Sequence, residues 1–194
     1  MLEKAPPALG RILEGVRAGM DKLVWANEGV AAPETIKVVS EAFAESEPIP
    51  YLYTEDGEKI SPPLSWSGTP AGAVSVILVV EDADSPTPSP IVHALVYDLP
   101  PGDCHLKAGA LPSKGGPGEA AGYAMGRNSF RAAQYLAPDP PPAHGPHRYV
   151  FQVYALDRRP DLSEEPEKSD ILTALLGHVI ARGSLTGTYE RGRG

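Results

Sequence analysis

This chain of 194 residues has little cysteine and lacks long apolar runs. Cys104 is its only cysteine. A single cysteine cannot form an intramolecular disulfide or supply a cysteine-rich metal site, and its ordinary role is that of a small buried hydrophobe. No run of roughly 18 consecutive apolar residues is present, and Pro6 and Pro7 interrupt the start of the chain where a signal peptide has its apolar core. We therefore expect a cytoplasmic protein with no stable membrane insertion.

Positive charge is also scarce. Seventeen basic residues stand against 25 acidic residues, for a formal net charge of -8. This balance gives no global field that attracts phosphodiester backbones or anionic membranes, so nucleic acid is excluded as an expected partner. A small anionic ligand stays open, because charges a few ångströms away outweigh distant charges that salt screens over about 10 Å.

Glycine and proline are abundant, at 20 and 22 residues, and 42% of the residues are hydrophobic. The first pair of numbers favours a loop-rich β fold, while the apolar fraction is too high for a disordered chain. The length favours one domain. We divide the chain into an N-terminal amphipathic helical extension (1–35), a β domain (36–190) and a short tail (191–194).

Three segments predict long strands, at residues 73–84, 91–99 and 147–157. Each is rich in β-branched or aromatic residues and is bounded by proline, glycine or aspartate. Their nearly continuous apolarity is typical of strands that are covered on both faces. The predicted fold is therefore mainly β, with these strands at the centre of a sandwich.

Each of these strands carries one ionisable group at or near an end. By simple alternation Asp82, His93 and His147 lie on the same face as apolar neighbours, namely Val80, Leu95 and Tyr149 in that order. A buried charge is costly unless it is paired. We therefore predict that the three groups converge at one edge of the sheet.

Two helices are predicted outside the strands. Residues 8–25 carry apolar side chains at helical spacing, and this stripe either covers the core or contacts a partner protein or a second copy of the chain. Near the C-terminus, Ser169 can cap a helix that runs through Val179 and Ile180 to a stop at Gly183.

The stretch PPPAHGPHRY (140–149) precedes the third long strand and combines prolines, histidines and an arginine. Proline fixes φ and lacks an N–H, so this loop predicts a stiff wall beside the strand. Arg148 has the opposite parity to His147, and we expect it to support the loop through a carboxylate such as Asp84. His144 is interpreted as a rim residue.

Five ordered blocks resemble the phosphatidylethanolamine-binding proteins, in particular their bacterial Raf-kinase-inhibitor-like branch, over residues 36–190. The blocks are DGEKISPPLSW, VVEDADSP with VHALVYDLP, GRNSF, PPPAHGPHRYVFQVYALD and GHVIARGSLTGTYER. The resemblance implies an antiparallel β-sandwich with peripheral helices, here with an extra N-terminal helix and a C-terminal helix. It also implies a small cavity at a sheet edge that binds phosphate-like anions such as a phosphoethanolamine headgroup.

Carried over by motif, the resemblance implies a set of site residues and their supports. Ligand-binding positions are Asp82, Pro86, His93, Pro140, Pro141, His147 and Tyr149, and supporting positions are Asp84, Arg148 and His144. Alanine stands where the family usually has proline (83), tryptophan (94) or glycine (137 and 143), which puts the shape of the rim in question. The resemblance implies no cofactor, no metal and no catalytic residue.

Two imidazoles and a tyrosine can donate hydrogen bonds to phosphate oxygens, and a protonated imidazole adds charge assistance. The alternative function is a hydrolase with a Ser/His/Asp arrangement built on Ser61, Ser65 or Ser129, although no GxSxG motif is present. A zinc site made of His93, His144, His147 and Asp82 is a second alternative, without an HExxH motif. The third alternative is the binding of a protein partner at the pocket rim, because eukaryotic members of the family that the chain resembles restrain kinases or proteases.

Overall fold

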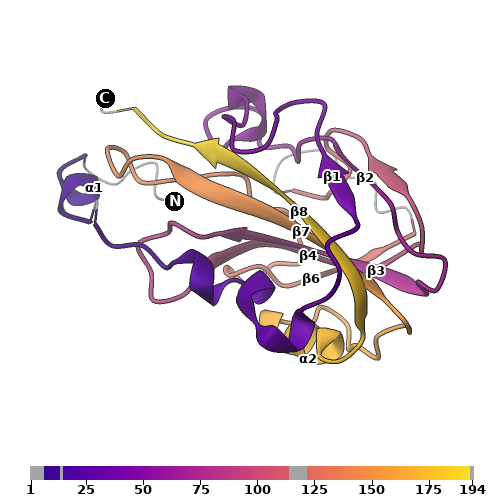
Figure 1. Ribbon diagram of the computed structural model, residues 1–194. Coiled ribbons are helices and arrows are strands. Elements are labelled where there is room, and N and C mark those ends of the chain that lie inside the picture. The colour runs from indigo at the N-terminus through magenta and orange to yellow at the C-terminus, as the bar shows by residue number, and fades with distance from the viewer. Residues whose placement is uncertain (1–6, 14, 114–121, 193–194) are drawn as a thin grey trace.

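The computed structural model describes residues 7–13, 15–113 and 122–192, and it contains two antiparallel sheets (Figure 1). The smaller sheet has the strand order β1-β2-β5, and the larger has the order β6-β4-β3-β7-β8. The small sheet comprises β1 (Lys37–Val39), β2 (Leu64–Ser67) and β5 (Cys104–Leu106). The large sheet comprises β3 (Ser75–Asp82), β4 (Ile91–Leu99), β6 (Ala124–Gly126), β7 (His147–Leu156) and β8 (Val179–Tyr189).

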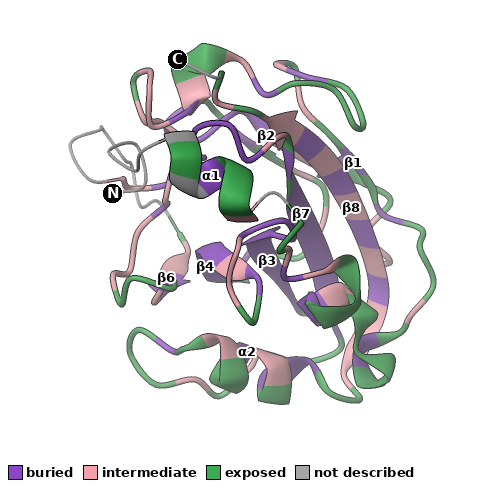
Figure 2. Ribbon diagram, turned by 90° about the vertical axis from the view of Figure 1, so that its left-hand side faces the viewer, coloured by how far each residue is buried: buried purple, intermediate pink, exposed green. Residues whose placement is uncertain are grey.

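The helices are short and peripheral. Within the described residues the α-helices are α1 (Pro7–Leu13) and α2 (Lys168–Leu175). Single 3₁₀ turns occur at Met20–Lys22, Val24–Ala26, Glu28–Val30 and Tyr51–Tyr53. Figure 1 places α1 beyond the end of the large sheet, and both views separate it from α2 (Figures 1 and 2).

The large sheet is covered on both faces, as its continuous apolar strands predict. Every residue of β3 is buried (Figure 2). Successive side chains of this strand enter two different cores. One core lies between the sheets, with Leu78, Trp66 and Phe151 among its members. The other lies under α2 and includes Ile77, Ile171 and the N-terminal Val24. The prediction of a mainly β sandwich with peripheral helices is confirmed.

The predicted helix over residues 8–25 is wrong beyond Leu13. The chain instead has no regular structure from residue 16 to Gly19, whose φ of 106° lies in the region that favours glycine, and it then continues in 3₁₀ turns. Here it pairs with the loop after β3, as the Ala18 amide donates to the Ser85 carbonyl at 2.9 Å and the Gly19 amide to the Ala83 carbonyl at 2.8 Å. A helix would consume these amide groups internally, so the tertiary pairing overrides the helical spacing.

The C-terminal helix is capped two residues earlier than predicted and is much shorter. Glu167, rather than Ser169, caps it through a reciprocal pair of bonds with Asp170. It ends at Leu175 because Gly177 adopts a φ of 73°, and the chain then enters β8. Val179 and Ile180 therefore belong to a strand rather than to the helix.

Candidate functional site

The three ionisable groups at the strand ends do converge. Asp82 ends β3 and His147 begins β7, and the Oδ2 of Asp82 lies 2.8 Å from the Nδ1 of His147. His93 on β4 and Tyr149 on β7 place their rings edge to face with centroids 5.1 Å apart. All four residues are buried. The sheet therefore gathers a carboxylate, two imidazoles and a phenol at one edge.

The convergence of His93 has a cause that alternation does not predict. The pairing of β3 with β4 shifts register between Val80 and Glu81, which pair with Ala94 and Val92 respectively. His93 is the extra residue of this bulge. Its alternation partner Leu95 packs in the core under α2, whereas His93 packs against Tyr149 on the inner face. The expectation that His93 shares the face of Leu95 is wrong, and the bulge turns the ring to the side of Asp82.

His144 is not a rim residue, which corrects our interpretation of the loop. It is fully buried, and its Nδ1 lies 2.6 Å from the Nε2 of His147. Its own Nε2 lies 2.7 Å from the Leu13 carbonyl oxygen. Burial, and next the neighbouring His147, lower the pKa of His144. Both ring nitrogens of His147 are thus engaged, one by Asp82 and one by His144.

His93 has one engaged nitrogen and one that is free to meet a ligand. Its Nδ1 lies 2.7 Å from the Leu136 carbonyl oxygen, so this nitrogen carries the hydrogen. Within the described residues the Nε2 has no hydrogen-bond partner. Burial lowers the pKa of His93, although Asp82 opposes this effect. In its neutral form the ring therefore presents a lone pair at Nε2, and only the protonated form donates there.

Tyr149 carries a buried hydroxyl group without a hydrogen-bond partner in the part of the chain that the structure describes. Burial first, and then the carboxylates of Asp82 and Asp139, raise the pKa of Tyr149 well above its usual value. The group stays a neutral donor at every physiological pH. Buried polar atoms are nearly always paired, so an orphaned hydroxyl beside ligand-type side chains indicates a place that a ligand or water fills.

The expected support by Arg148 is present. Its Nε and one terminal nitrogen each donate to a different oxygen of Asp84 at 2.7 Å, and its backbone amide donates to the same carboxylate at 2.9 Å. Arg17 adds a further ion pair with Asp84 at 3.2 Å. Burial raises the pKa of the Asp84 carboxyl group, but the hydrogen bonds and the charge of Arg148 outweigh this effect and hold the pKa below its usual range. This cluster fixes the loop after β3 to the start of β7.

A cavity of about 10 Å³ lies at the site, which is the room of roughly one water molecule. Among the predicted ligand-binding residues Asp82, Pro86, His93 and His147 line it, whereas Pro140, Pro141 and Tyr149 do not. Sequence reasoning missed the other lining residues, which are Ser85, Ile91, Phe130, Leu136 and Asp139. Of these, Ser85 lies in the block VVEDADSP and Phe130 in the block GRNSF, so membership of these blocks could have indicated both residues.

Arg191 ties the C-terminal end of the chain to this site, although we placed it in the tail. Its guanidinium group donates to Asp139 and to the Pro140 carbonyl at 2.8 Å each, and it contacts both oxygens of Asp56. Tyr189 also donates to Asp56, at 2.7 Å. The proline loop is thereby anchored from the far end of the sequence.

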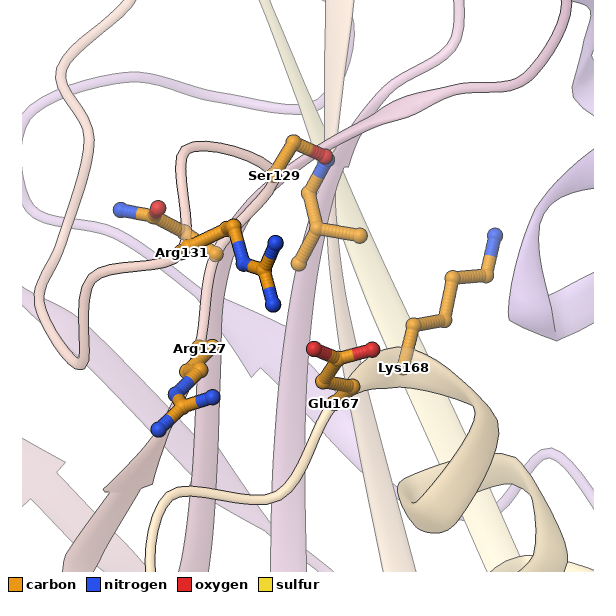
Figure 3. A pocket seen from close by; sticks show the side chains of 7 residues that line it. Arg127, Ser129, Arg131, Glu167 and Lys168 are labelled. Atoms are coloured by element: carbon orange, nitrogen blue, oxygen red, sulfur yellow. The ribbon is translucent and has the colours of Figure 1, made fainter.

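A second, larger pocket of about 350 Å³ opens beside the GRNSF block and the start of α2 (Figure 3). Arg127, Arg131 and Lys168 line it together with Glu167. The cations are largely compensated: Lys168 pairs with the buried Glu81 at 2.5 Å, and Arg127 pairs with a carboxylate at 3.2 Å. Lys168 extends away from the other labelled groups (Figure 3). This pocket therefore lacks the excess positive charge that an anion site needs.

The serines of the hydrolase alternative lie apart from the buried histidines. The hydroxyl of Ser61 accepts from the Leu111 amide, and that of Ser129 accepts from the Val92 amide. Ser65 pairs with His105 at 2.8 Å on the exposed face of the small sheet. None of the three contacts His93 or His147, so the site has no activated serine nucleophile among the candidates.

The described ranges hold no group of three or more His, Cys, Asp or Glu side chains arranged to bind a metal ion. The four residues of the zinc alternative instead bond to one another or to backbone carbonyls. A search of the same residues finds no helix with the length and apolarity required to cross a membrane.

Comparison with known proteins agrees with this fold and these motifs. The family model described as phosphatidylethanolamine-binding protein matches residues 39–190. A UPF0098 protein of Methanothermobacter thermautotrophicus is 40% identical over 156 residues, which cover 78% of this chain and 96% of the relative. A UPF0098 protein of Pyrococcus horikoshii is 32% identical over 191 residues, which cover 98% of this chain and 95% of the relative. That second similarity extends into the N-terminal segment.

Two solved structures share the architecture. A putative phosphatidylethanolamine-binding protein homologue from Chlamydia trachomatis is 36% identical, with a TM-score of 0.72, over 81% of this chain and 99% of its own. The Escherichia coli protein YbcL, described as a member of the mammalian family, is 28% identical with a TM-score of 0.73, over 80% of this chain and 98% of its own.

Proposed function

The chain belongs to the phosphatidylethanolamine-binding protein family, and from that premise we propose that it binds a small anion such as phosphate or a phosphate headgroup at the cavity beside His93. The observation that carries the proposal is the Nε2 of His93, a cavity-lining residue, which has no hydrogen-bond partner among the described residues, together with the unpartnered hydroxyl of Tyr149, whose ring packs against His93. The family description and the names of the relatives mention no reaction, so we propose binding without catalysis.

The charges around the cavity make this binding depend on a proton. Asp82 and Asp139 both line the cavity, but Asp82 is bonded to His147 and Asp139 is paired with Arg191 at 2.8 Å. In each of these pairs the negative carboxylate offsets the positive charge of its partner, so neither pair offers a net positive charge to an anion. A positive donor is obtained only when His93 takes up a proton at Nε2, because its other nitrogen is already committed to the Leu136 carbonyl.

The size of the cavity requires a movement at its mouth. A volume of about 10 Å³ has room for roughly one water and not for a phosphate group. Phe130 lines the cavity while 45% of its surface is exposed, so its ring can swing outward with little loss of burial. Anion binding is therefore expected to expose the ring of Phe130 further.

Calorimetry with sulfate tests the proposal, because sulfate does not itself titrate between pH 5 and 8, whereas phosphate does. Burial lowers the pKa of His93, so its ring is neutral before binding and must take up about one proton for each anion bound, and the affinity rises as the pH falls from 8 to 5. Titrations in two buffers with different ionisation enthalpies count the protons. Phosphate and phosphoethanolamine, measured in parallel, then show which source of the anion binds best.

His93→Asn is the informative variant, since the asparagine amide can keep the bond to Leu136 while the Nε2 position is lost. We expect the affinity for sulfate to fall about tenfold or more and the proton uptake to disappear. His105→Asn is the matched control, because His105 is exposed on β5 and its side chain bonds to Ser65, away from the cavity. Equal sulfate affinity in both variants, or binding without proton uptake, would refute the proposal.

A protein partner at the pocket rim and the formation of a homodimer stay predictions. Ile12, Val16 and Met20 of the N-terminal segment are exposed, at 76%, 46% and 38%. These side chains are the surface that a second copy or another protein would cover.

A further inference from the structure

We propose that the N-terminal segment is a strap that one proton holds against the histidine pair. The strap is defined as α1 together with residues 15–17, and the histidine pair is His144 with His147. The strap is closed while the pair shares three protons, and it is released when the pair loses one of them. The inference concerns the strap alone and goes beyond the proposed anion binding.

The geometry is a chain of three hydrogen bonds in a row. It runs from the Oδ2 of Asp82 to the Nδ1 of His147 at 2.8 Å, and from the Nε2 of His147 to the Nδ1 of His144 at 2.6 Å. It ends with the Nε2 of His144, which lies 2.7 Å from the carbonyl oxygen of Leu13 at the end of α1. The strap thus closes the chain with a backbone carbonyl that is 131 residues away in sequence.

Counting hydrogens shows why a proton is required. Each of the three contacts needs one hydrogen, and both ends of the chain, an ionised carboxylate and a carbonyl, can only accept. Two neutral imidazoles carry only two hydrogens between them. The complete chain therefore holds one proton more than the neutral pair, and this extra positive charge is balanced by the charge of Asp82.

Loss of that proton leaves one contact with two facing lone pairs, and the strap contact is the one that can open. The side chains of Asp82 and His147 are only 5% and 1% exposed and belong to adjacent central strands. His144 is fully buried in the loop that leads into β7. The strap is different, because Arg11 and Ile12 of α1 and Val16 beyond it are exposed to solvent.

Two further contacts define how the strap sits. Gly10 lies so close to the Pro142 carbonyl that a Cβ atom at this position could not fit. Arg17 donates to the Pro146 carbonyl at 2.9 Å and pairs with Asp84, so it anchors the far end of the strap by contacts that do not titrate near neutral pH. Gly15, in contrast, has open space where a Cβ would lie.

Several other charged or titratable groups surround the histidine pair and are kept constant in the design. Those on or near the pair's neighbouring elements are Asp84 and Arg17, Arg148 and Tyr149 of β7, His93 of β4, Asp139 of the proline loop, and Arg191. Asp84, Asp139 and the arginines are held in ion pairs. His93 titrates, so its imidazole signals are followed separately.

Asp82→Asn is the deciding variant, because the asparagine amide supplies the missing hydrogen. Its oxygen can still accept from the Asp84 amide, which bonds to Oδ1 at 2.8 Å. Its NH₂ group then donates to the Nδ1 of His147, and two neutral imidazoles complete the remaining contacts. We expect the strap of this variant to stay closed from pH 5 to 8.

The measurement combines imidazole ¹⁵N shifts with hydrogen exchange of the Val16 amide, which donates to the Leu13 carbonyl at 2.7 Å. In the unmodified chain we expect protection of this amide, corrected for the intrinsic effect of pH, to fall about tenfold or more as the pair loses its proton. Protection that stays constant through that titration overturns the proposal, as does an Asp82→Asn protein with the pH dependence of the unmodified chain.

A glycine pair gives an independent arm that leaves the histidines intact. Gly10→Ala forces α1 off the proline loop, so Val16 is expected to be unprotected at every pH, and the pair is expected to lose its proton at a lower pH because closure and proton binding are reciprocal. Gly15→Ala should behave as the unmodified chain does. If Asp82→Asn does not fold, this arm decides alone. The proposal is then overturned if the histidine pair loses its proton at the same pH in Gly10→Ala as in Gly15→Ala. These measurements are made without added anion, so their outcome is separate from that of anion binding.

Discussion

Replacement of Arg191 by methionine tests how the end of the chain supports the site. The guanidinium group is bonded to Asp56, Asp139 and the Pro140 carbonyl, and its side chain is only 12% exposed. Methionine keeps most of the apolar stem and removes all of the donors. The hydrogen bonds and the positive charge that Arg191 gives to Asp56 and Asp139 are then lost.

The magnitude follows from the burial of these carboxylates. Removing one partner of a buried ion pair costs about 3 to 5 kcal/mol. Asp139 and Asp56 are 13% and 26% exposed, and Tyr189 still donates to Asp56, so water and this hydroxyl offset part of the loss. We expect the free energy of unfolding to fall by about 3 kcal/mol at pH 7, the lower end of that range.

The loss must also depend on pH. Burial raises the pKa of Asp56, but the bonds to Arg191 and Tyr189 outweigh it and hold the pKa below its usual value. A carboxyl group with a depressed folded pKa contributes stability that is present above the unfolded pKa, about 3.9, and disappears as the pH falls through the folded value. The difference between Arg191→Met and the unmodified chain should therefore shrink below about pH 4.

Urea unfolding at pH 7, and again at a pH below the pKa of a free aspartate side chain, measures both effects. Arg127→Met is the matched control, because Arg127 pairs with Glu165 at 3.2 Å on the surface, where the side chains are 39% and 50% exposed. Its expected cost is below about 1 kcal/mol. If the two substitutions destabilise the protein equally, or if the Arg191→Met loss is the same at both pH values, the reasoning fails.

Two further predictions concern the loop and the core. Ala143 has a φ of 62°, which costs an L-residue about 1 kcal/mol, so Ala143→Gly should raise the midpoint of thermal unfolding, whereas Ala137→Gly, at a position without a positive φ, should lower it. Leu175 is fully buried under the sheet and its neighbour Leu176 is 43% exposed, so Leu175→Ala should cost about 2 to 5 kcal/mol in urea unfolding and Leu176→Ala less than about 1 kcal/mol. A lower midpoint for Ala143→Gly, or similar losses for the two leucines, would contradict these arguments.

The N-terminal segment shows how local pattern and tertiary structure diverge. Its apolar spacing indicates a helix through residue 25, yet only α1 is helical, because the amides of Ala18 and Gly19 pair with the loop after β3. Leu23 and Val24 are buried as the pattern suggests, but from an extended chain with 3₁₀ turns. Burial of an apolar residue is therefore more predictable than the backbone conformation that delivers it.

The sequence by itself determined the sandwich and the identity of its polar edge. Continuous apolar strands require cover on both faces, and a charge at the end of such a strand requires a partner, so the meeting of Asp82 and His147 at one sheet edge could be expected from the strand pattern. The pairing of Arg148 with Asp84 followed from the same reasoning.

Only the tertiary structure decided how that edge works. Alternation cannot place the bulge that turns His93 inward, since a bulge depends on the register with the neighbouring strand. It also cannot show that His144 bonds both to His147 and to the carbonyl of Leu13, or that Arg191 holds the proline loop, because these contacts join segments far apart in the chain. Their existence depends on packing in three dimensions, and with it the number of protons that the histidine pair must hold.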